Sequence, residues 1–413
     1  MTRPNLRRLA VAATLAFSAA LPAAAQTKVE VIHWWTSGSE AAAIKAIADA
    51  YRATGGVWVD TSVAISEQAR AVAVNRIVGG NPPAVAQFNT TKQFHDLVEE
   101  GLLAPIDDVA VKEGWDKFLP ELVLNSIRVK GHYYAAPVNI HSTSWFWFSM
   151  PALKKAGVAE VPTTFDDLFV ALDKLKAAGL IPLAHGGQTW QDAMMFTTTL
   201  SNVGGKELYL KVLRDRDPKT ILGEDLKKVL LAYKRLQSYT DRGAPGRNWN
   251  DATALLIAGK AGVQAMGDWA KGEFLLAKQV PGKDYACRAG ITGKGAYVVQ
   301  GDVLVFPKNK DAAVSKAQQQ IASIALNPTV QVAFSAKKGS VPVRPDVDAS
   351  KLDPCGQEGV AILRDKTRLV GNPEMYLSPD ENGAMVDVLT NYWNRNIPVE
   401  KVQKDLLNAL AKR

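Results

Sequence analysis

Residues 29–38 read Val-Glu-Val-Ile-His-Trp-Trp-Thr-Ser-Gly, and this stretch decides the fold. Its first residues alternate like a β-strand, and Thr-Ser-Gly at its end is a turn and helix-cap signal. A helix is predicted for residues 39–52, because Ile44, Ile47 and Tyr51 recur at helical spacing on one face. A strand followed by a helix is the unit of an α/β sheet, whose ligand crevice opens at the carboxyl ends of its strands.

Two adjacent tryptophans, Trp34 and Trp35, stand at the carboxyl end of this predicted strand. Consecutive side chains of a strand point to opposite faces of the sheet, so the two indoles cannot both face the same side. Burial of both rings in the core is the alternative. We expect at least one of them to point into the crevice.

The N-terminal segment 1–25 has the pattern of a Sec signal peptide. Arginines at positions 3, 7 and 8 precede an apolar run over positions 9–21, and an Ala-x-Ala cleavage site stands before Gln26. The apolar run is too short to span a bilayer, and no second long apolar run follows. We therefore expect an exported, periplasmic protein whose mature chain begins at Gln26.

Composition excludes several classes of function. The formal net charge of +8 falls by three when the leader is removed, and the remaining excess is scattered, without the basic stripe that nucleic-acid binding needs. Five histidines and two cysteines show no metal-ligand spacing, so we expect no metal and no cofactor. Cys287 and Cys355 can pair in an oxidising compartment.

The mature chain, from Gln26 to Arg413, is too long for one core and suggests two domains. Its N-terminal part alternates predicted strands and helices, which favours an α/β class with a mostly parallel sheet. No Pro/Gly-rich linker separates two halves, so several chain crossings are expected in place of one tether. The extended segment 133–148 is too long for an ordinary strand and could pass from one domain to the other.

Aromatic and polar side chains gather in predicted loops and at strand ends. Indole faces can stack on the C–H faces of a sugar, while amides, a carboxylate and a lysine match its hydroxyl groups. Any one of these residues could instead be a cap, a turn residue or a satisfied core group, and it is their combination that predicts sugar binding. The candidates are Trp34, Trp35, Gln87, Asn89, Asn139, His141, Gln188, Trp190, Asp268, Trp269 and Lys338.

Short segments along nearly the whole mature chain resemble one family, the periplasmic extracellular solute-binding proteins of ABC sugar importers, and within it the glucose/mannose-type branch. The matching segments are His33-Trp-Trp-Thr-Ser-Gly, Gly80-Asn-Pro-Pro, Ala136-Pro-Val-Asn-Ile-His-Ser-Thr, Ala184-His-Gly-Gly-Gln, Trp190-Gln-Asp, Arg247-Asn-Trp-Asn, Gly259-Lys-Ala-Gly-Val-Gln, Met266-Gly-Asp-Trp-Ala-Lys-Gly-Glu-Phe and Lys338-Gly-Ser-Val-Pro-Val-Arg. The two cysteines also fall where this branch carries its pair.

The resemblance implies a two-lobed periplasmic-binding-protein clamshell with several inter-lobe crossovers. The first lobe would hold positions 26–138 and about 287–341, and the second lobe positions 139–286 and about 342–413. Such a protein captures a sugar in the cleft and delivers it to the ABC transporter permease in the inner membrane. A chemoreceptor is a further partner that such a clamshell can serve, and we expect a monomer.

The resemblance also implies roles for individual residues. Two tryptophans, Trp35 and Trp269, would be the stacking platforms. The hydrogen-bonding candidates would be Trp34, Asn139, Gln188, Asp268 and Lys338.

Two departures from the branch concern the identity of the sugar. Asn89 lies near a position where some relatives carry lysine, and Met375-Tyr-Leu replaces an expected Met-Ala-His segment. An amide both donates and accepts hydrogen bonds, whereas lysine only donates them. We therefore expect a sugar other than glucose, either altered or larger, to bind most tightly.

The alternative class is a secreted carbohydrate-active enzyme, chiefly a glycoside hydrolase. That reaction needs two carboxyl groups flanking the scissile bond. Acidic candidates exist, but no motif marks a pair of them, and no hydrolase, metalloprotease or phosphate-loop signature is present. The candidates are Asp192, Asp251, Asp268 and Asp302. We therefore expect a binding protein without catalytic activity.

Overall fold

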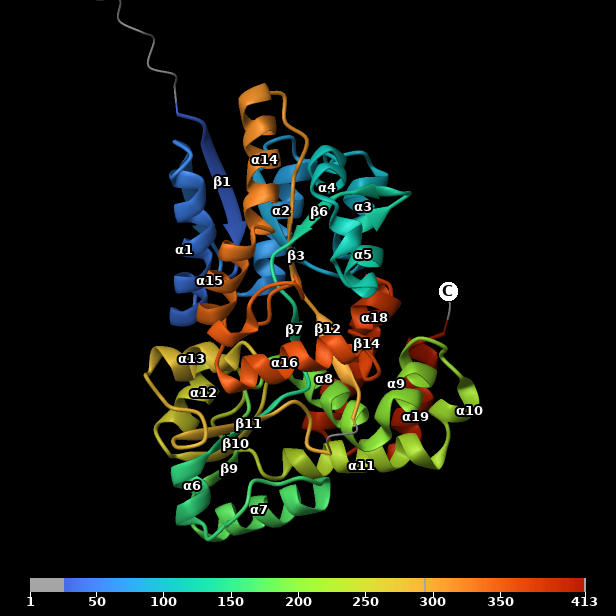
Figure 1. Cartoon of the computed structure of the whole chain (residues 1–413). Coiled ribbons are helices and arrows are strands. Elements are labelled where there is room, and N and C mark those ends of the chain that lie inside the picture. The colour runs from blue at the N-terminus through green and yellow to red at the C-terminus, as the bar shows by residue number, and fades with distance from the viewer. Residues whose placement is uncertain (1–25, 293–294, 412–413) are drawn as a thin grey trace, which may run out of the picture.

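The computed structural model describes residues 26–292 and 295–411. The predicted signal peptide lies outside the described residues. Two α/β bodies lie one above the other, each built on its own sheet (Figure 1). We call the body that contains the first strand lobe 1 and the other lobe 2.

Lobe 1 is built on a five-stranded sheet in the order β2-β1-β3-β13-β6. The first three strands are parallel, and β13 runs antiparallel to both of its neighbours. The parallel part confirms the alternating strand and helix pattern of the N-terminal sequence. The strands are β1 (Lys28–His33), β2 (Val57–Ser62), β3 (Val85–Asn89), β6 (Ala135–Pro137) and β13 (Asp302–Val305).

The helix predicted after the first strand is present as α1 (Gly38–Arg52). Ser37 caps it by accepting a hydrogen bond from the backbone N–H of Glu40 at 3.4 Å, and its buried face includes Ile44, Ile47 and Tyr51. This face packs against the two helices that follow β13. The other helices of lobe 1 are α2 (Ser66–Val78), α3 (His95–Glu99), α4 (Asp107–Glu113), α5 (Glu121–Ile127), α14 (Ala312–Ala325) and α15 (Pro328–Lys338).

Lobe 2 is built on a four-stranded sheet in the order β11-β8-β10-β9. Every residue of its strand β8, Phe-Trp-Phe-Ser, is buried, as expected of a strand covered on both faces. The strands are β8 (Phe146–Ser149), β9 (Ile181–Leu183), β10 (Ala261–Ala265) and β11 (Tyr285–Arg288). The helices that follow β8 and precede β11 are α6 (Met150–Lys155), α7 (Phe165–Ala177), α8 (Thr189–Thr199), α9 (Gly205–Leu213), α10 (Pro218–Ile221), α11 (Glu224–Gln237), α12 (Trp249–Ile257) and α13 (Ala270–Leu276).

A third sheet, in the order β14-β12-β7, joins the lobes near the middle of the molecule. The segment 133–148 contributes β6 to the sheet of lobe 1, β7 (His141–Ser142) to this third sheet and β8 to the sheet of lobe 2. This confirms that the long extended segment crosses between the two bodies. The partners of β7 come from the return crossing and the C-terminal part, β12 (Tyr297–Gln300) and β14 (Leu369–Gly371).

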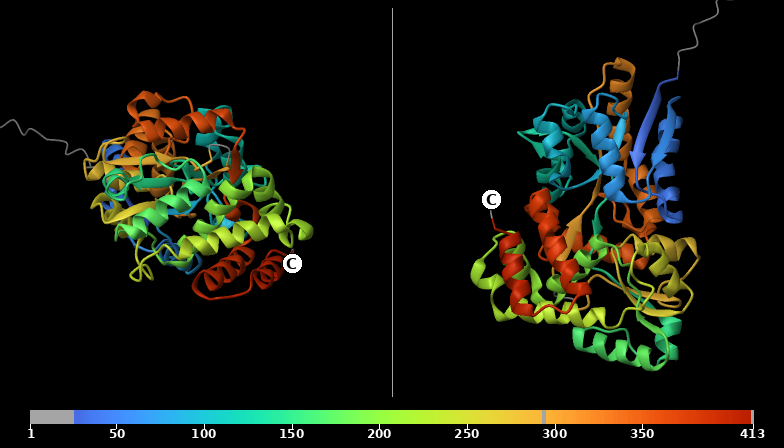
Figure 2. Two further views of the ribbon diagram at one scale, coloured as in Figure 1. Left: turned by 90° about the horizontal axis from the view of Figure 1, so that it is seen from below. Right: turned by 180° about the vertical axis from the view of Figure 1, so that it is seen from behind.

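The C-terminal helices return to lobe 2. In Figure 2 the last two helices, α18 and α19, lie next to each other beside that lobe, and α18 packs against both α8 and α19. The disulfide predicted from the cysteine count is confirmed, since Cys287 of β11 is bonded to Cys355 at the start of α16. These helices are α16 (Pro354–Asp365), α17 (Pro373–Tyr376), α18 (Pro379–Asn394) and α19 (Val399–Ala409). No helix among the described residues is both long and apolar enough to cross a membrane.

Candidate functional site

A cavity of about 920 Å³ lies between the two lobes. Lobe 1 lines it with the carboxyl ends of β1 and β3, the start of α1 and one face of α2, and lobe 2 lines it with α8, α12 and the residue before α13. The C-terminal helices α17 and α18 line the rest. The crevice therefore opens where the parallel strands end, as expected for an α/β sheet.

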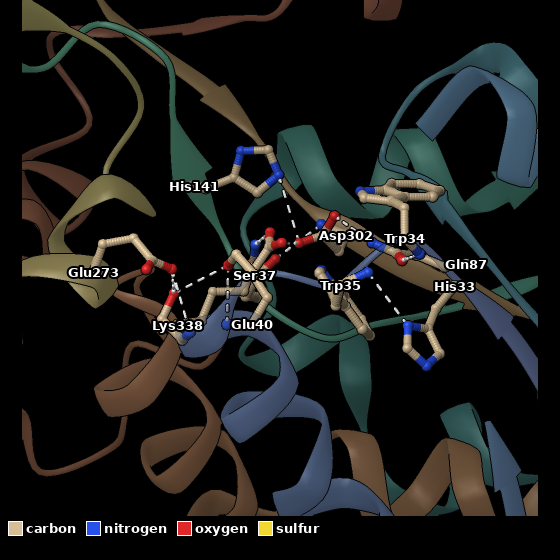
Figure 3. A network of polar contacts seen from close by, with 12 residues as sticks. His33, Trp34, Trp35, Ser37, Glu40, Gln87, His141, Glu273, Asp302 and Lys338 are labelled. Atoms are coloured by element: carbon tan, nitrogen blue, oxygen red, sulfur yellow. Dashed lines mark hydrogen bonds and ion pairs between the residues drawn. The ribbon is translucent and has the colours of Figure 1, made fainter. Parts of the chain in front are cut away.

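The structure separates the two adjacent tryptophans. Trp34 lines the cavity, and its backbone N–H donates to Gln87 at 3.0 Å. Trp35 does not line the cavity, because its side chain lies in the hydrophobic core, 1 % exposed, with its ring edge-on to Phe334 at 5.3 Å. The two indoles point in opposite directions in Figure 3, directly after β1 ends at His33.

Three tryptophans of lobe 2 form one aromatic wall of the cavity. The ring of Trp269 lies 6.4 Å from that of Trp190 and 6.5 Å from that of Trp249. His141 meets Trp269 edge-on, with the ring centroids 5.0 Å apart. Gln188 also lines the cavity, and its side-chain oxygen accepts a hydrogen bond from the indole N–H of Trp190 at 2.9 Å. This bond fixes the orientation of one ring of the wall.

A cluster of ionisable side chains lines the cavity at the junction of the lobes. Lys338 Nζ lies 2.8 Å from Glu40 Oε1 and 3.9 Å from Asp302 Oδ2, and His141 Nε2 lies 3.7 Å from the same Asp302 oxygen. Figure 3 shows these side chains directed toward one another from α15, α1, β13 and β7. We call Glu40, His141, Asp302 and Lys338 the charged cluster.

The electrostatics of the charged cluster favour its ionised form. Burial opposes ionisation of Asp302, but the charges of Lys338 and His141, together with polar contacts from His141 and Asn139, outweigh it and lower its pKa to about 2. Burial also opposes the charged form of Lys338, yet the carboxylates of Glu40 and Asp302 raise the pKa of this ammonium group. Both shifts favour the charged forms of Asp302 and Lys338, which give the cavity a charged acceptor beside a charged donor.

A glycine allows Lys338 to reach the cluster. Lys338 is the last residue of α15, and Gly339 ends that helix in the left-handed region at φ 92°. A Cβ at residue 339 would lie 2.7 Å from the backbone oxygen of Asp268, closer than side-chain carbons approach such an atom. The Lys-Gly pair in the sequence therefore sets the end of α15 against lobe 2.

Two predicted site residues lie behind the cavity wall. Asn139 is fully buried, and its side-chain oxygen accepts a hydrogen bond from the backbone N–H of Asp302 at 2.9 Å. Asp268 is 2 % exposed, and its Oδ2 accepts a hydrogen bond from the backbone N–H of Ser142 at 3.1 Å. Neither side chain lines the cavity. Both instead hold the crossing segments in place.

Burial has a strong effect on Asp268. Its Oδ1 has no hydrogen-bond partner among the described residues. Desolvation raises the pKa of this carboxyl group to about 7, although His141, Lys271 and Lys338 act in the opposite direction. Asp268, although its pKa is raised, therefore does not reach a ligand in the cavity.

The remaining predicted residue, Asn89, lines the cavity at the carboxyl end of β3. Sequence reasoning missed Glu40, Arg70, Trp249 and Glu374 as cavity residues, and it considered Asp302 only as a hydrolase candidate. Glu40 had a recognisable signal, because it stands three positions after the capping Ser37, where an acidic residue supports a helix start.

The lobes also contact each other directly beside the cavity. Ser39 of α1 donates from its hydroxyl to Glu273 of α13 at 2.7 Å, and Gln93 donates to Glu374 of α17 at 2.8 Å. Among the described residues, no group of three or more His, Cys, Asp or Glu side chains is arranged to hold a metal ion.

Comparison with known proteins agrees with this architecture. The chain is 40% identical over 399 residues, 95% of each chain, to a probable sugar-binding periplasmic protein of Rhizobium meliloti. It is 39% identical to a protein of the same description from Brucella melitensis, covering 92% of this chain and 91% of the relative. These identities extend along both lobes.

Solved structures share the fold. The bacterial solute receptor AcbH, described as having an exclusive preference for β-D-galactopyranose, superposes with a TM-score of 0.77 at 20% identity, covering 93% of this chain and 98% of the receptor. Maltose-bound MalE3 of T. maritima gives a TM-score of 0.76 at 17% identity, covering 93% and 99%. Residues 35–322 match the family described as bacterial extracellular solute-binding protein. The chain is therefore a member of the bacterial extracellular solute-binding protein family.

Proposed function

We propose that this chain is the periplasmic sugar-binding component of an ABC importer, which captures a sugar between its lobes and delivers it to an inner-membrane permease. The observation that carries the proposal is that the aromatic wall of Trp190, Trp249 and Trp269 lines the same cavity as the charged cluster. The curated relatives named as probable sugar-binding periplasmic proteins support it over the full length of the chain.

The chemistry of the cavity suits an uncharged polyol. A sugar ring presents C–H faces to indoles and hydroxyl edges to charged or amide groups. Lys338 has three N–H donors, and in the part of the chain that the structure describes only Glu40 lies within hydrogen-bond distance of its nitrogen. Asp302 Oδ2 has no hydrogen-bond partner among the described residues. Sugar hydroxyl groups would supply the missing hydrogen-bond partners of both side chains.

The proposed site differs from the one expected from sequence in its stacking platforms. In lobe 2 the stacking platforms are Trp269, Trp190 and Trp249. In lobe 1 the stacking platform is Trp34 and not Trp35, because Trp34 is the indole that lines the cavity. His141, Gln188, Asn89 and Lys338 stay in the proposed site. Asn139 and Asp268 support it from behind.

The proposal extends to the lobes and to export. Lobe 1 comprises positions 26–138 with about 287–341, and lobe 2 the rest of the mature chain. The protein is exported to the periplasm through a cleaved signal peptide that ends at Ala25. The exported protein is a monomer. Mass spectrometry of the secreted form should find Gln26 at the N terminus, whereas an uncleaved leader would contradict this part of the proposal.

A binding role is favoured over glycoside hydrolysis by the protonation of the acidic groups. Hydrolysis needs one carboxyl group that retains its proton near the bond to be cleaved. Asp302 at the cavity has its pKa lowered to about 2, and Asp268, whose pKa is raised, does not line the cavity. Glu374 lines the cavity and has its pKa raised by burial, but its carboxyl oxygens already accept hydrogen bonds from Gln93 and Asn382. We propose that the protein does not turn over its ligand.

A thermal-shift screen tests the function. A ligand at 100 times its Kd adds about 2.7 kcal/mol to the free energy of unfolding, so binding is readily detected. At least one sugar should raise the melting temperature and be recovered chemically unchanged. Uptake and swimming assays of a deletion strain with that sugar then separate transport from service to a chemoreceptor. If no sugar shifts the melting temperature, the proposal fails.

A further inference from the structure

The cavity extends well beyond the charged cluster. Besides the cluster and the aromatic wall of lobe 2, its lining includes residues of α2 in lobe 1 and of α17 and α18 at the C-terminal end. Pockets for drug-sized ligands range from roughly 300 to 1,000 Å³, and this cavity of about 920 Å³ lies near the upper limit. We call the part between α2 and α17–α18 the far end.

Hydrogen bonds between the two lobes lie beside the cavity at both of its ends. Ser39 contacts Glu273 beside the charged cluster, and Gln93 contacts Glu374 at the far end. Lys92 adds a bond from its ammonium group to the backbone oxygen of Tyr376 at 3.3 Å. The two lobes therefore already meet, and the far end remains open between them.

Arg70 of α2 carries unused hydrogen-bond donors at the far end. Its guanidinium lies 5.7 Å from the ring centroid of Trp34, and its side chain is 18 % exposed. Glu67 Oε1 lies 3.7 Å away, beyond hydrogen-bond distance, and no hydrogen bond from this guanidinium is formed among the described residues. The guanidinium nitrogens of Arg70 are not among the polar atoms buried away from solvent, so a ligand in the cavity can reach N–H donors that no described protein group accepts from.

The charges at the far end favour a neutral ligand. Burial raises the pKa of Glu374, and the charge of Arg70 opposes this effect while the charge of Glu67 adds to it, so the three side chains act on one another. The far end therefore carries basic groups, Arg70 and Lys92, beside the acidic groups Glu67 and Glu374, and no single sign of charge dominates it. A carboxylate or phosphate on the ligand would meet these acids, whereas hydroxyl groups can accept from Arg70 and donate to the carboxylates.

We propose that the far end is a second saccharide subsite, with Arg70 as its hydrogen-bonding residue, and that the ligand is a neutral disaccharide or longer oligosaccharide. This rests on the proposed sugar-binding function and specifies its ligand class. Trp34 lies between the two subsites, because Arg70 covers its ring and Gln87 links its backbone to Asp302 of the charged cluster.

Gly383 of α18 offers a direct steric test. It lines the cavity, and a Cβ at this position would meet no atom within 4 Å. Gly383→Phe therefore adds bulk to the far end, and replacing glycine inside a helix does not weaken the helix. Asn391→Phe is the matched control, because residue 391 is exposed on the same helix and does not line the cavity. Arg70→Met removes the donors without adding bulk.

Titration calorimetry would compare glucose, galactose, mannose and xylose with maltose, cellobiose, lactose, trehalose, xylobiose and maltotriose. We expect one oligosaccharide to bind at least tenfold more tightly than its constituent monosaccharides. Gly383→Phe and Arg70→Met should each weaken that oligosaccharide at least tenfold and change the monosaccharides less than threefold, while Asn391→Phe changes neither.

The outcomes separate this inference from the function on which it rests. A monosaccharide that binds as tightly as the best oligosaccharide, or an oligosaccharide whose affinity survives Arg70→Met, would overturn the second subsite and leave sugar binding intact. The absence of binding by every sugar in the panel would overturn both.

Discussion

Lys338 and Glu40 form a buried ion pair between residues 298 positions apart in the chain, with 2.8 Å between Nζ and Oε1. The pair joins the first helix of lobe 1 to its last helix, at the edge of the cavity. It also places both side chains in the charged cluster. Stability and ligand binding therefore depend on the same contact.

Removing one partner of this pair should destabilise the protein strongly. Lys338→Met leaves the carboxylate of Glu40 buried without its counter-charge, which costs roughly 3–5 kcal/mol in comparable pairs. The double variant Lys338→Met with Glu40→Gln should lose less than the sum of the single losses, because Glu40→Gln removes the carboxylate that Lys338→Met leaves without a partner. Urea unfolding of the four proteins measures this. Additive losses would show that the pair contributes no coupling energy.

The two adjacent tryptophans should respond oppositely to truncation. Trp35→Ala removes a core side chain and should cost about 3–5 kcal/mol of folding free energy. Trp34→Ala should leave stability nearly unchanged and weaken sugar binding by roughly 2 kcal/mol if its ring is an anchor of the site. Denaturant titration of both variants measures the change in folding free energy, and titration calorimetry measures the change in sugar affinity. A stable Trp35→Ala protein that has lost affinity would return Trp35 to the site.

The sequence predicted the fold more completely than the site. Alternating patterns and the capping signal after the first strand identified the parallel part of lobe 1, and the length of segment 133–148 indicated a crossing. Strand alternation could say that only one of Trp34 and Trp35 faces the cavity. It could not say which one, because the absolute facing of β1 depends on how the helices α2 and α14 pack against it.

Long-range contacts explain the residues that were missed. Glu40 follows a helix cap, a place where acidic residues are usually solvated, and only the arrival of Lys338 from α15 makes it a buried cavity residue. The position of Asp268 next to Trp269 predicted that its carboxylate accepts hydrogen bonds from sugar hydroxyl groups. The fold instead covers it, because its carboxylate bonds to the backbone of the crossing strand at Ser142.

The buried Asp268 should make folding stability depend on pH. Its pKa is raised from an ordinary 3.8 to about 7 by burial, so the folded state binds this proton more tightly than the unfolded state does. The stability associated with this group is present below about pH 3.8 and is lost as the pH rises through 7. Asp268→Asn should therefore gain melting temperature relative to the parent protein between pH 5 and pH 8. Asn391→Ala, an exposed change that removes no titratable group, is the control, and an equal response of both variants would contradict the assignment.

The disulfide should contribute substantially to stability. Cys287 and Cys355 close a loop with a sequence separation of 68 residues, for which the chain-entropy treatment gives roughly 4 kcal/mol. Replacing both cysteines by serine should lower the free energy of unfolding by about that amount. Denaturant titration of the oxidised parent and the double variant measures the difference. Equal midpoints would mean that the unfolded chain gains no freedom from the loss of the bond.

The most direct test of the account is titration calorimetry of the best-binding sugar against the parent protein, Trp269→Ala and Glu40→Gln. The account predicts one binding site per chain, because a single cavity holds both the aromatic wall and the charged cluster. Each variant should weaken binding at least tenfold, a change of about 1.4 kcal/mol. If both variants keep the parent affinity while remaining folded, the sugar does not bind between Trp269 and the charged cluster, and the central claim is wrong.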